Sequence, residues 1–362
     1  MATTEGMKRG GYYDDHSEYQ RKVAASGDEL VRDAVTHAPD LRAGATFVIA
    51  DYGCSTGRNS IASLRTAVDA VRTRDPRRPV AAIHNDVPTN DWNTLFANLR
   101  EDPHSYLRAS GPAVLPLASA RSFFEPATPA ATVHLGMSFS AAHWLRTQPD
   151  VTVPEGFYFC EATGPARETL RTQGAADWEA FLAARAEDLA PGARLIVQMV
   201  GTDTPPASAE PRVTARALLS AMAQVAADMV RDGTLDAGVV DRYVLPVCAR
   251  TVDEARAPVD AGGPLADRFA VVLARTDPVA NPYLDRWRTD HDAAAYGTAY
   301  AAFVRGFTES NLREHLFAPG ARSGTPDSAT DDYFARLERR FAADPEADAF
   351  EDWTLTVVLT RR

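Results

Sequence analysis

Residues 46–59 read TFVIADYGCSTGRN and decide the fold. The stretch begins as a short apolar run that ends in an acidic residue, Asp51, and glycines follow at Gly53 and Gly57. Asn59–Arg74 then shows the apolar periodicity of a helix. This order predicts a strand, a turn whose glycines let the backbone approach a ligand closely, and a helix whose first N–H groups lack partners.

Seven short apolar runs bounded by turn residues are predicted to be strands: Thr46–Asp51, Val80–His84, Ala113–Leu117, Thr132–Ser138, Arg194–Val200, Arg268–Ala274 and Thr354–Thr360. The last three are almost continuously apolar, which is typical of strands covered on both faces. Helical patterns lie between the runs, at Asn59–Arg74, Trp178–Leu189 and Val213–Arg231, and Pro191-Gly192 is expected to stop the second of them. The alternation predicts an α/β fold with a mostly parallel sheet.

Two stretches interrupt this alternation. Gly201–Val240 begins as a loop rich in Pro, Ser and Ala and continues as a long amphipathic helix, and Pro278–Ala349 is helical and rich in aromatic residues. We expect both to form a helical cap over the sheet. Ligand pockets commonly lie at such an interface, outside the carboxyl ends of the strands.

A second acidic strand end lies at Asn85-Asp86, after the run VAAIH. An acidic group at the end of the second strand is where the ribose of a nucleoside cofactor binds. The glycine spacing after Asp51 is D-x-G-x-x-x-G, which differs from the G-x-G-x-x-G of dinucleotide sites, and no P-loop lysine follows. These features favour S-adenosylmethionine (SAM). A turn that serves only as a connection, or an NAD site, are the alternatives.

Composition excludes several classes of function. The 362 residues carry 38 Lys+Arg and 49 Asp+Glu, a formal charge of −11. Nucleic-acid binding requires a clustered basic surface, and a polybasic membrane anchor requires the same. No run approaches the roughly 20 apolar residues that span a bilayer. Three cysteines spaced far apart build neither a disulfide framework nor a metal site. We expect a cytoplasmic protein without nucleic-acid, membrane or metal partners.

Ordered blocks along nearly the whole chain resemble the SABATH family of SAM-dependent methyltransferases. Tyr13-x-x-x-Ser17-x-x-Gln20-x-Lys22 resembles S-Y-x-x-N-S-x-x-Q-x-K, and IADYGCSTGRN resembles I-A-D-L-G-C-S-S-G-P-N. HNDVPTNDWNTLF resembles L-N-D-L-P-x-N-D-F-N-x-L-F, and MSFSAAHWL resembles S-S-Y-S-L-x-W-L. The chain departs from the pattern at His16, Arg58 and Ser310. Its arginine-rich, alanine-rich composition suggests a bacterial member.

The resemblance implies a Rossmann-like class I methyltransferase core, with a seven-stranded mostly parallel sheet and an α-helical cap. The implied divisions are a SAM-binding core with an N-terminal lid (1–204), a cap segment (205–240), a return to the sheet (241–277), a second cap segment (278–349) and a last strand (350–362). The family also suggests a homodimer.

The resemblance further implies which residues bind the cofactor. Asp51 and Gly53 would line the methionine side of SAM, with Asn59 supporting the turn. The remaining cofactor residues are Tyr13 and Ser17 in the lid, Asp86 and Val87 at the ribose and adenine, Ser122 and Phe123 over the adenine ring, and Ser138.

Gln20 and Trp144 match the pair that holds the acceptor carboxylate in the family's carboxyl methyltransferases. Both offer neutral N–H donors, and a carboxylate is already deprotonated at neutral pH, so no general base is required. His143 either donates to the carboxylate or, for a phenol or ring nitrogen, acts as a base. Phe303 and Phe307 lie four residues apart on one helix face and, with Val304, are expected to line the acceptor pocket. Packing alone is the other interpretation of these cap residues.

The sequence therefore predicts a SAM-dependent O-methyltransferase that forms the methyl ester of a small carboxylic acid by direct SN2 transfer and releases S-adenosylhomocysteine. Two alternatives remain open at this stage. One is N- or O-methylation of a heterocycle or phenol with His143 as base, and the other is a SAM-binding protein without catalysis. The sequence does not name the acceptor, and a peptide C-terminus is among the possibilities.

Overall fold

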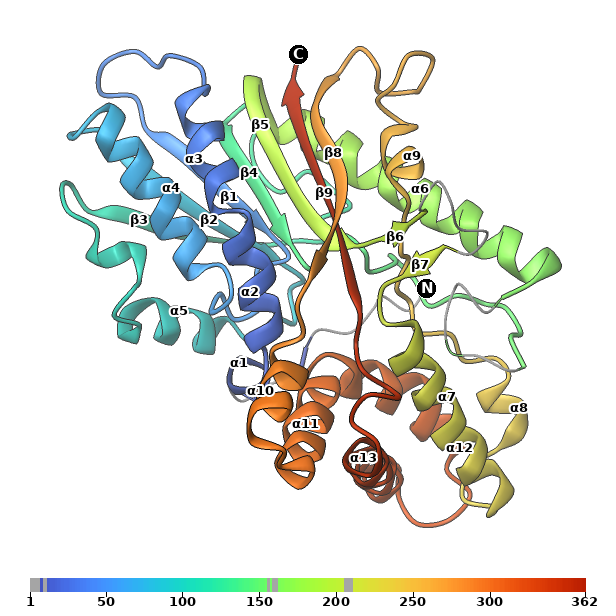
Figure 1. Ribbon diagram of the computed structural model, residues 1–362. Coiled ribbons are helices and arrows are strands. Elements are labelled where there is room, and N and C mark those ends of the chain that lie inside the picture. Colours follow the sequence, from blue (N-terminus) through green and yellow to red (C-terminus); the bar gives the residue numbers. More distant parts are fainter. Residues whose placement is uncertain (1–6, 9–11, 155–156, 158–161, 205–210) are drawn as a thin grey trace.

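The computed structural model describes residues 7–8, 12–154, 157, 162–204 and 211–362. A seven-stranded sheet forms the centre of the molecule (Figure 1). The strand order is β3 (Val114–Ala120), β2 (Val80–Asp86), β1 (Phe47–Tyr52), β4 (Val133–Phe139), β5 (Leu189–Val200), β9 (Asp352–Arg361) and β8 (Phe269–Val279). Neighbours from β3 to β5 run parallel, whereas β9 is antiparallel to both β5 and β8. The predicted seven-stranded, mostly parallel sheet is confirmed.

Helices cover both faces of the sheet, because successive strand residues point to opposite sides. Ile49 packs in an apolar cluster with α3 (Asp28–Thr36), α4 (Ile61–Arg74), α5 (Trp92–Glu101) and η1 (Tyr106–Arg108). The next residue, Ala50, belongs to a second cluster on the opposite face, with α6 (Gly164–Asp188) and α9 (Val252–Arg256). Burial on both sides explains why the central strands are almost continuously apolar.

The remaining helices gather beyond one end of the sheet and are called the helical cap below (Figure 1). They are α7 (Arg216–Arg231), α8 (Ala237–Val240), α10 (Pro282–Asp290), α11 (Ala293–Leu312), the π-helical turn η3 (Arg313–Phe317), α12 (Ala318–Gly320) and α13 (Pro326–Ala343). The N-terminal helix α1 (Tyr12–Asp15) contacts α11, and α2 (Glu18–Ser26) packs Tyr19 and Val23 into the core of the cap. The N-terminal segment therefore links the cap to the sheet. The division of the chain at 204, 240, 277 and 349 stays a prediction.

Three local details differ from expectation. Helix α6 begins at Gly164 rather than Trp178 and ends at Asp188, before Pro191-Gly192. That dipeptide lies inside β5, where the pairing with β4 shifts register between Val133 and Leu135. A short ribbon, β6 (Thr202–Asp203) paired with β7 (Arg212–Val213), lies where a loop was expected. In the part of the chain described, no helix has the length and apolar character needed to cross a membrane.

Candidate active site

The glycine turn after β1 is fixed by close packing at Gly53. Its φ is +81°, and a Cβ at this position would lie 2.3 Å from the Cβ of Ala141, so only glycine fits. The backbone N–H groups of Gly53 and Cys54 donate to the carbonyl of Asn85 at 2.9 and 3.1 Å. The turn after β1 is thereby tied to the end of β2, which brings the two acidic strand ends together.

Asp51 and Asp86 form a pair of buried carboxylates at these strand ends. Burial raises the pKa of Asp51 to about 7, the hydrogen bond from Ser60 Oγ (2.5 Å) opposes that rise, and the charge of Asp86 adds to it. Burial also raises the pKa of Asp86, although its oxygens accept the N–H groups of Ser55 (2.7 Å) and Val87 (2.8 Å). Among the described residues, no Lys, Arg or His lies within salt-bridge distance of either carboxylate. Two buried carboxylates without a cation suit a cationic ligand such as SAM.

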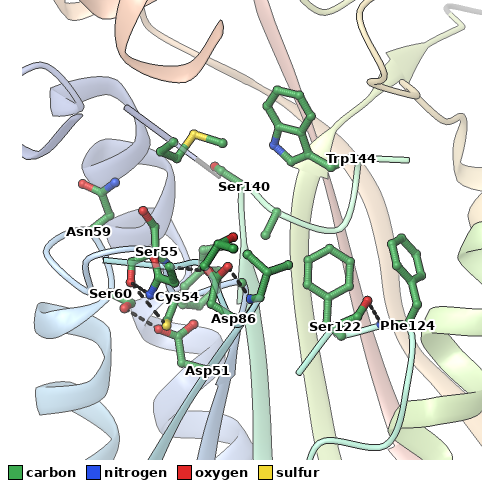
Figure 2. Close-up of a pocket in the computed structure, with 18 of the residues that line it drawn as sticks. Asp51, Cys54, Ser55, Asn59, Ser60, Asp86, Ser122, Phe124, Ser140 and Trp144 are labelled. Atoms are coloured by element: carbon green, nitrogen blue, oxygen red, sulfur yellow. Dashed lines mark hydrogen bonds between the residues drawn. The ribbon is translucent and has the colours of Figure 1, made fainter. Parts of the chain in front are cut away.

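A cavity of about 410 Å³ opens beside this pair, and Figure 2 shows Asp51, Asp86 and Ser60 across it from Ser122 and Phe124. It is called the first cavity below. The predicted cofactor residues that line it are Asp51, Gly53, Asn59, Asp86, Val87, Ser122 and Phe123. These residues come from β1, the following turn, β2 and the segment after β3, so the topology brings them together.

Two predicted cofactor residues, Ser17 and Ser138, do not line the first cavity. Ser17 is buried and its Oγ donates to Asn59 Oδ1 at 2.8 Å, so it contacts the wall from behind. Ser138 is also buried and donates to the backbone carbonyl of Tyr52 at 2.9 Å. The Tyr13 side chain lies outside the described part of the structure.

A smaller cavity of about 70 Å³, the second cavity below, lies between the sheet and the helical cap. Five of the predicted acceptor residues line it, namely Gln20, His143, Trp144, Phe303 and Phe307. Val304 does not line this cavity and is fully buried in the core of the cap. Met7, Ser140 and Trp144 line both cavities, so the two adjoin at these residues.

The polar groups of the second cavity are neutral. Gln20 is 9% exposed, and its Oε1 is buried without a hydrogen-bond partner among the described residues. His143 Nδ1 accepts the backbone N–H of Val200 at 3.4 Å, so the neutral ring carries its proton on Nε2. Burial, with a smaller contribution from the charge of Arg250, lowers the pKa of His143 to about 3. The imidazole is therefore a neutral donor at physiological pH.

Sequence reasoning missed Ser60, Met7 and Ser140. Ser60 stands at the N-cap of α4, where a hydroxyl normally binds the first turn of its own helix. Its side chain makes no such cap and donates to Asp51 instead. Met7 lies outside the quoted motifs, and Ser140 lies within the MSFSAAHWL block without having been singled out; both stand where the two cavities meet. In the described ranges, no group of three His, Cys, Asp or Glu side chains is placed to hold a metal ion.

The fold and the buried acidic pair define a class I SAM-dependent methyltransferase. The family model described as SAM dependent carboxyl methyltransferase matches residues 1–362, and the chain belongs to this family. It is thus an enzyme that uses SAM to convert a carboxylic acid into its methyl ester, and the expected activity and cofactor are confirmed.

Relatives and a solved structure agree with this assignment. A probable jasmonic acid carboxyl methyltransferase of Theobroma cacao is 25% identical over 345 residues, covering 90% of this chain and 88% of the relative. A farnesoic acid carboxyl-O-methyltransferase of Arabidopsis thaliana is 27% identical over 258 residues, covering 67% of this chain and 70% of the relative. The solved structure of a loganic acid methyltransferase with SAH shares the fold, with a TM-score of 0.78, 22% identity and 98% of each chain covered.

Proposed function

We propose that the first cavity holds SAM and the second holds the acceptor acid, with methyl transfer where they adjoin. The observation that carries this proposal is the shared wall of Met7, Ser140 and Trp144. A methyl donor and its acceptor have to meet across a short distance, and two cavities with a common wall provide such a meeting point. Trp144 stands at the edge of the first cavity, on the side away from Asp51 and Asp86 (Figure 2).

The residues of the first cavity suit a cationic cofactor. SAM, when bound, supplies an electrophilic methyl group on a sulfonium, and it also carries an α-ammonium group. Asp51 and Asp86 provide buried negative charge that has no cationic partner among the described residues. Ser60 orients Asp51, and Ser17 holds Asn59 by the 2.8 Å hydrogen bond. We assign Ser17 and Ser138 as supports of the cavity wall and Asn59, Val87, Ser122 and Phe123 as parts of its surface.

The residues of the second cavity suit an acceptor that arrives as an anion. Gln20, His143 Nε2 and the Trp144 indole are neutral donors that orient a carboxylate without the strong bidentate ion pair that an arginine would form. A carboxylate is deprotonated at neutral pH, so these groups act by positioning. The pKa of about 3 weighs against His143 as a general base, and thus against methylation of a phenol or heterocycle.

The residues that line the second cavity indicate what kind of carbon skeleton the acceptor has. Aromatic and aliphatic side chains make up most of them, and no Lys, Arg, Asp or Glu is among the described residues that line it. A second charge on the acceptor would have no partner there, which is costly in an apolar site. We therefore expect a monocarboxylic acid with a compact apolar skeleton. Jasmonic and farnesoic acids, named for two relatives, each have one carboxyl group on a largely apolar skeleton.

A screen with methyl-labelled SAM tests this assignment. It should include benzoates, indole acids, fatty and terpenoid acids, dicarboxylates, peptides, phenols and xanthines. We expect base-labile methyl esters of compact apolar monocarboxylates. Gln20→Ala and Trp144→Ala should each weaken ester formation, while the exposed change Arg100→Ala should not. Unchanged ester formation in both site variants would overturn the acceptor assignment.

The oligomeric state and location are also proposals. We propose a homodimer on the strength of the family resemblance and a cytoplasmic enzyme on the strength of the composition. Light scattering after size exclusion tests the first, and fractionation of the source cells tests the second. A monomeric mass, or recovery with the membrane or culture medium, would contradict them.

A further inference from the structure

Arg250 is a buried cation for which the reaction as described has no use. The residue is 2% exposed, and no carboxylate of the described chain lies within salt-bridge distance of its guanidinium. Its guanidinium donates to the backbone carbonyls of Gly174 at 2.7 Å and of Ala142 and Cys248 at 3.4 Å each, and to Met199 Sδ at 3.8 Å. The guanidinium also lies 5.5 Å from the centre of the Trp178 ring. A buried charge without a carboxylate is costly, so its presence calls for a compensating role.

Two of the carbonyls that Arg250 binds, those of Ala142 and Cys248, belong to segments that help to build the second cavity. Ala142 directly precedes His143 and Trp144. The segment before Arg250 runs beside them, because Cys248 N–H donates to the His143 carbonyl at 2.9 Å and Val247 pairs with Trp144. Arg250 therefore holds both segments at once, next to the two donors of the acceptor site.

The bond to Gly174 fixes this pair of segments to α6. A Cβ on Gly174 would lie 2.7 Å from Cys248 Sγ, so the glycine permits the close approach of α6 to this segment. Arg250 Nη2 reaches the Gly174 carbonyl across the contact at 2.7 Å. The backbone that presents His143 and Trp144 is thus anchored to a helix that packs on the sheet.

The charge of Arg250 has a second consequence for an anionic acceptor. The lining of the second cavity, as far as it is described, has no cationic side chain. Arg250 is close enough to influence the charge state of His143, which lines that cavity. The charge of Arg250 also opposes the rise that burial causes in the pKa of Asp177. The Asp177 carboxylate, however, accepts the backbone N–H of Arg146 at 2.9 Å. A positive charge behind neutral donors favours a carboxylate in a low-dielectric site without forming an ion pair with it.

We infer that Arg250 is a positioning residue of the acceptor site, which clamps the backbone bearing His143 and Trp144 and sets a buried positive charge behind them. This inference rests on the proposed function of the second cavity. Arg250 does not line either cavity, so it acts through the residues that it holds.

Steady-state kinetics of Arg250→Met and Arg250→Lys test the inference, with Arg256→Met as a control in an exposed ion pair with Asp260. In Arg250→Met, the KM for the acceptor should rise roughly threefold to thirtyfold, the range seen when a residue acts without ligand contact. The Kd for SAM should stay within about twofold of wild type. Arg250→Lys should recover part of the loss, because it restores the charge without the planar fork. The control should match wild type.

An acceptor KM that stays unchanged in both variants would overturn the inference, as would a SAM Kd that weakens in step with the acceptor KM. If Arg250→Met does not fold, Arg250→Lys provides the test, and the same result is expected: a raised KM for the acceptor with an unchanged Kd for SAM. Gln20→Ala and Trp144→Ala separate the two proposals. If they raise the acceptor KM while the Arg250 variants do not, only the role of Arg250 fails. If they too leave it unchanged, the acceptor site itself is wrongly assigned.

Discussion

The two cavities share a wall but differ in charge. The first cavity is bordered by Asp51 and Asp86, whose carboxylates are buried and lack a cationic partner among the described residues. The second offers neutral donors, Gln20, His143 and Trp144, in a mainly apolar wall. SAM is a cation at its reacting centre and the acceptor is an anion. On the proposed assignment, each cavity complements the charge of its own ligand, which would separate cofactor from acceptor before any reaction occurs.

The largest effect is expected from removing charge in the first cavity. Asp51→Asn keeps the size of the side chain but leaves a cationic ligand without its buried carboxylate. The Kd for SAM, measured by calorimetry, should rise by about a hundredfold or more. Asp69→Asn, a change in an exposed helix residue, is the control. A SAM Kd that remains near the wild-type value in Asp51→Asn would contradict the claim that the buried carboxylates of the first cavity bind the cofactor.

Adding charge to the second cavity should have the next largest effect. Gln20→Glu places a carboxylate opposite the acceptor carboxylate, so at pH 8 the acceptor KM should rise about thirtyfold or more. Gln20→Met, which removes the donor without adding charge, should raise it less. The SAM Kd should hardly change in either variant. Equal acceptor KM values in Gln20→Glu and wild type would show that no anion binds there.

The two cavities should also differ in their response to pH. The pKa of Asp51, raised to about 7 mainly by burial, means that its carboxylate becomes protonated as the pH falls through 7. The SAM Kd should therefore rise about tenfold between pH 8 and pH 6. The pKa of His143, lowered to about 3 by burial and Arg250, keeps this donor neutral throughout. The acceptor KM, measured at saturating SAM, should stay flat over that range. A flat SAM Kd would contradict the assignment to Asp51.

The smallest effect is expected at Ser60. Its 2.5 Å hydrogen bond to Asp51 opposes the rise in that pKa, so Ser60→Ala should move the pKa further upward. The pH at which SAM affinity begins to fall should shift upward too, and the SAM Kd at pH 7 should rise about threefold. Ser63→Ala, whose hydroxyl contacts Asp28 rather than the cofactor site, is a matched control on the same helix. A downward shift in the pH midpoint of SAM affinity in Ser60→Ala would refute the role of the hydrogen bond.

The sheet could be predicted from the sequence because its physical causes are local. Apolar runs such as TFVIAD and RLIVQMV mark strands buried on both faces, and the turn glycines mark where backbone meets ligand. The acidic strand ends Asp51 and Asp86 follow from the same pattern. The resemblance to a family then supplied Gln20 and Trp144 as the proposed acceptor residues, which no periodicity identifies.

The parts that could not be predicted depend on contacts between distant segments. Arg250 lies in a stretch without helix or strand periodicity, and its partners Ala142 and Gly174 come from two other segments. Val304 shares a helix with Phe303 and Phe307, and spacing alone does not tell which of the three faces the cavity. Ser60 fits the pattern of a helix cap, and only the fold places it beside Asp51.

The most direct test of the contrast between the cavities is a crystal structure with S-adenosylhomocysteine and an acceptor acid found in the screen. We predict that the cofactor product lies against Asp51 and Asp86 in the first cavity. The acceptor carboxylate should accept hydrogen bonds from Gln20 and Trp144 at the shared wall. An acceptor bound elsewhere, or one whose carboxylate pairs with an exposed cation such as Arg146, would contradict the account.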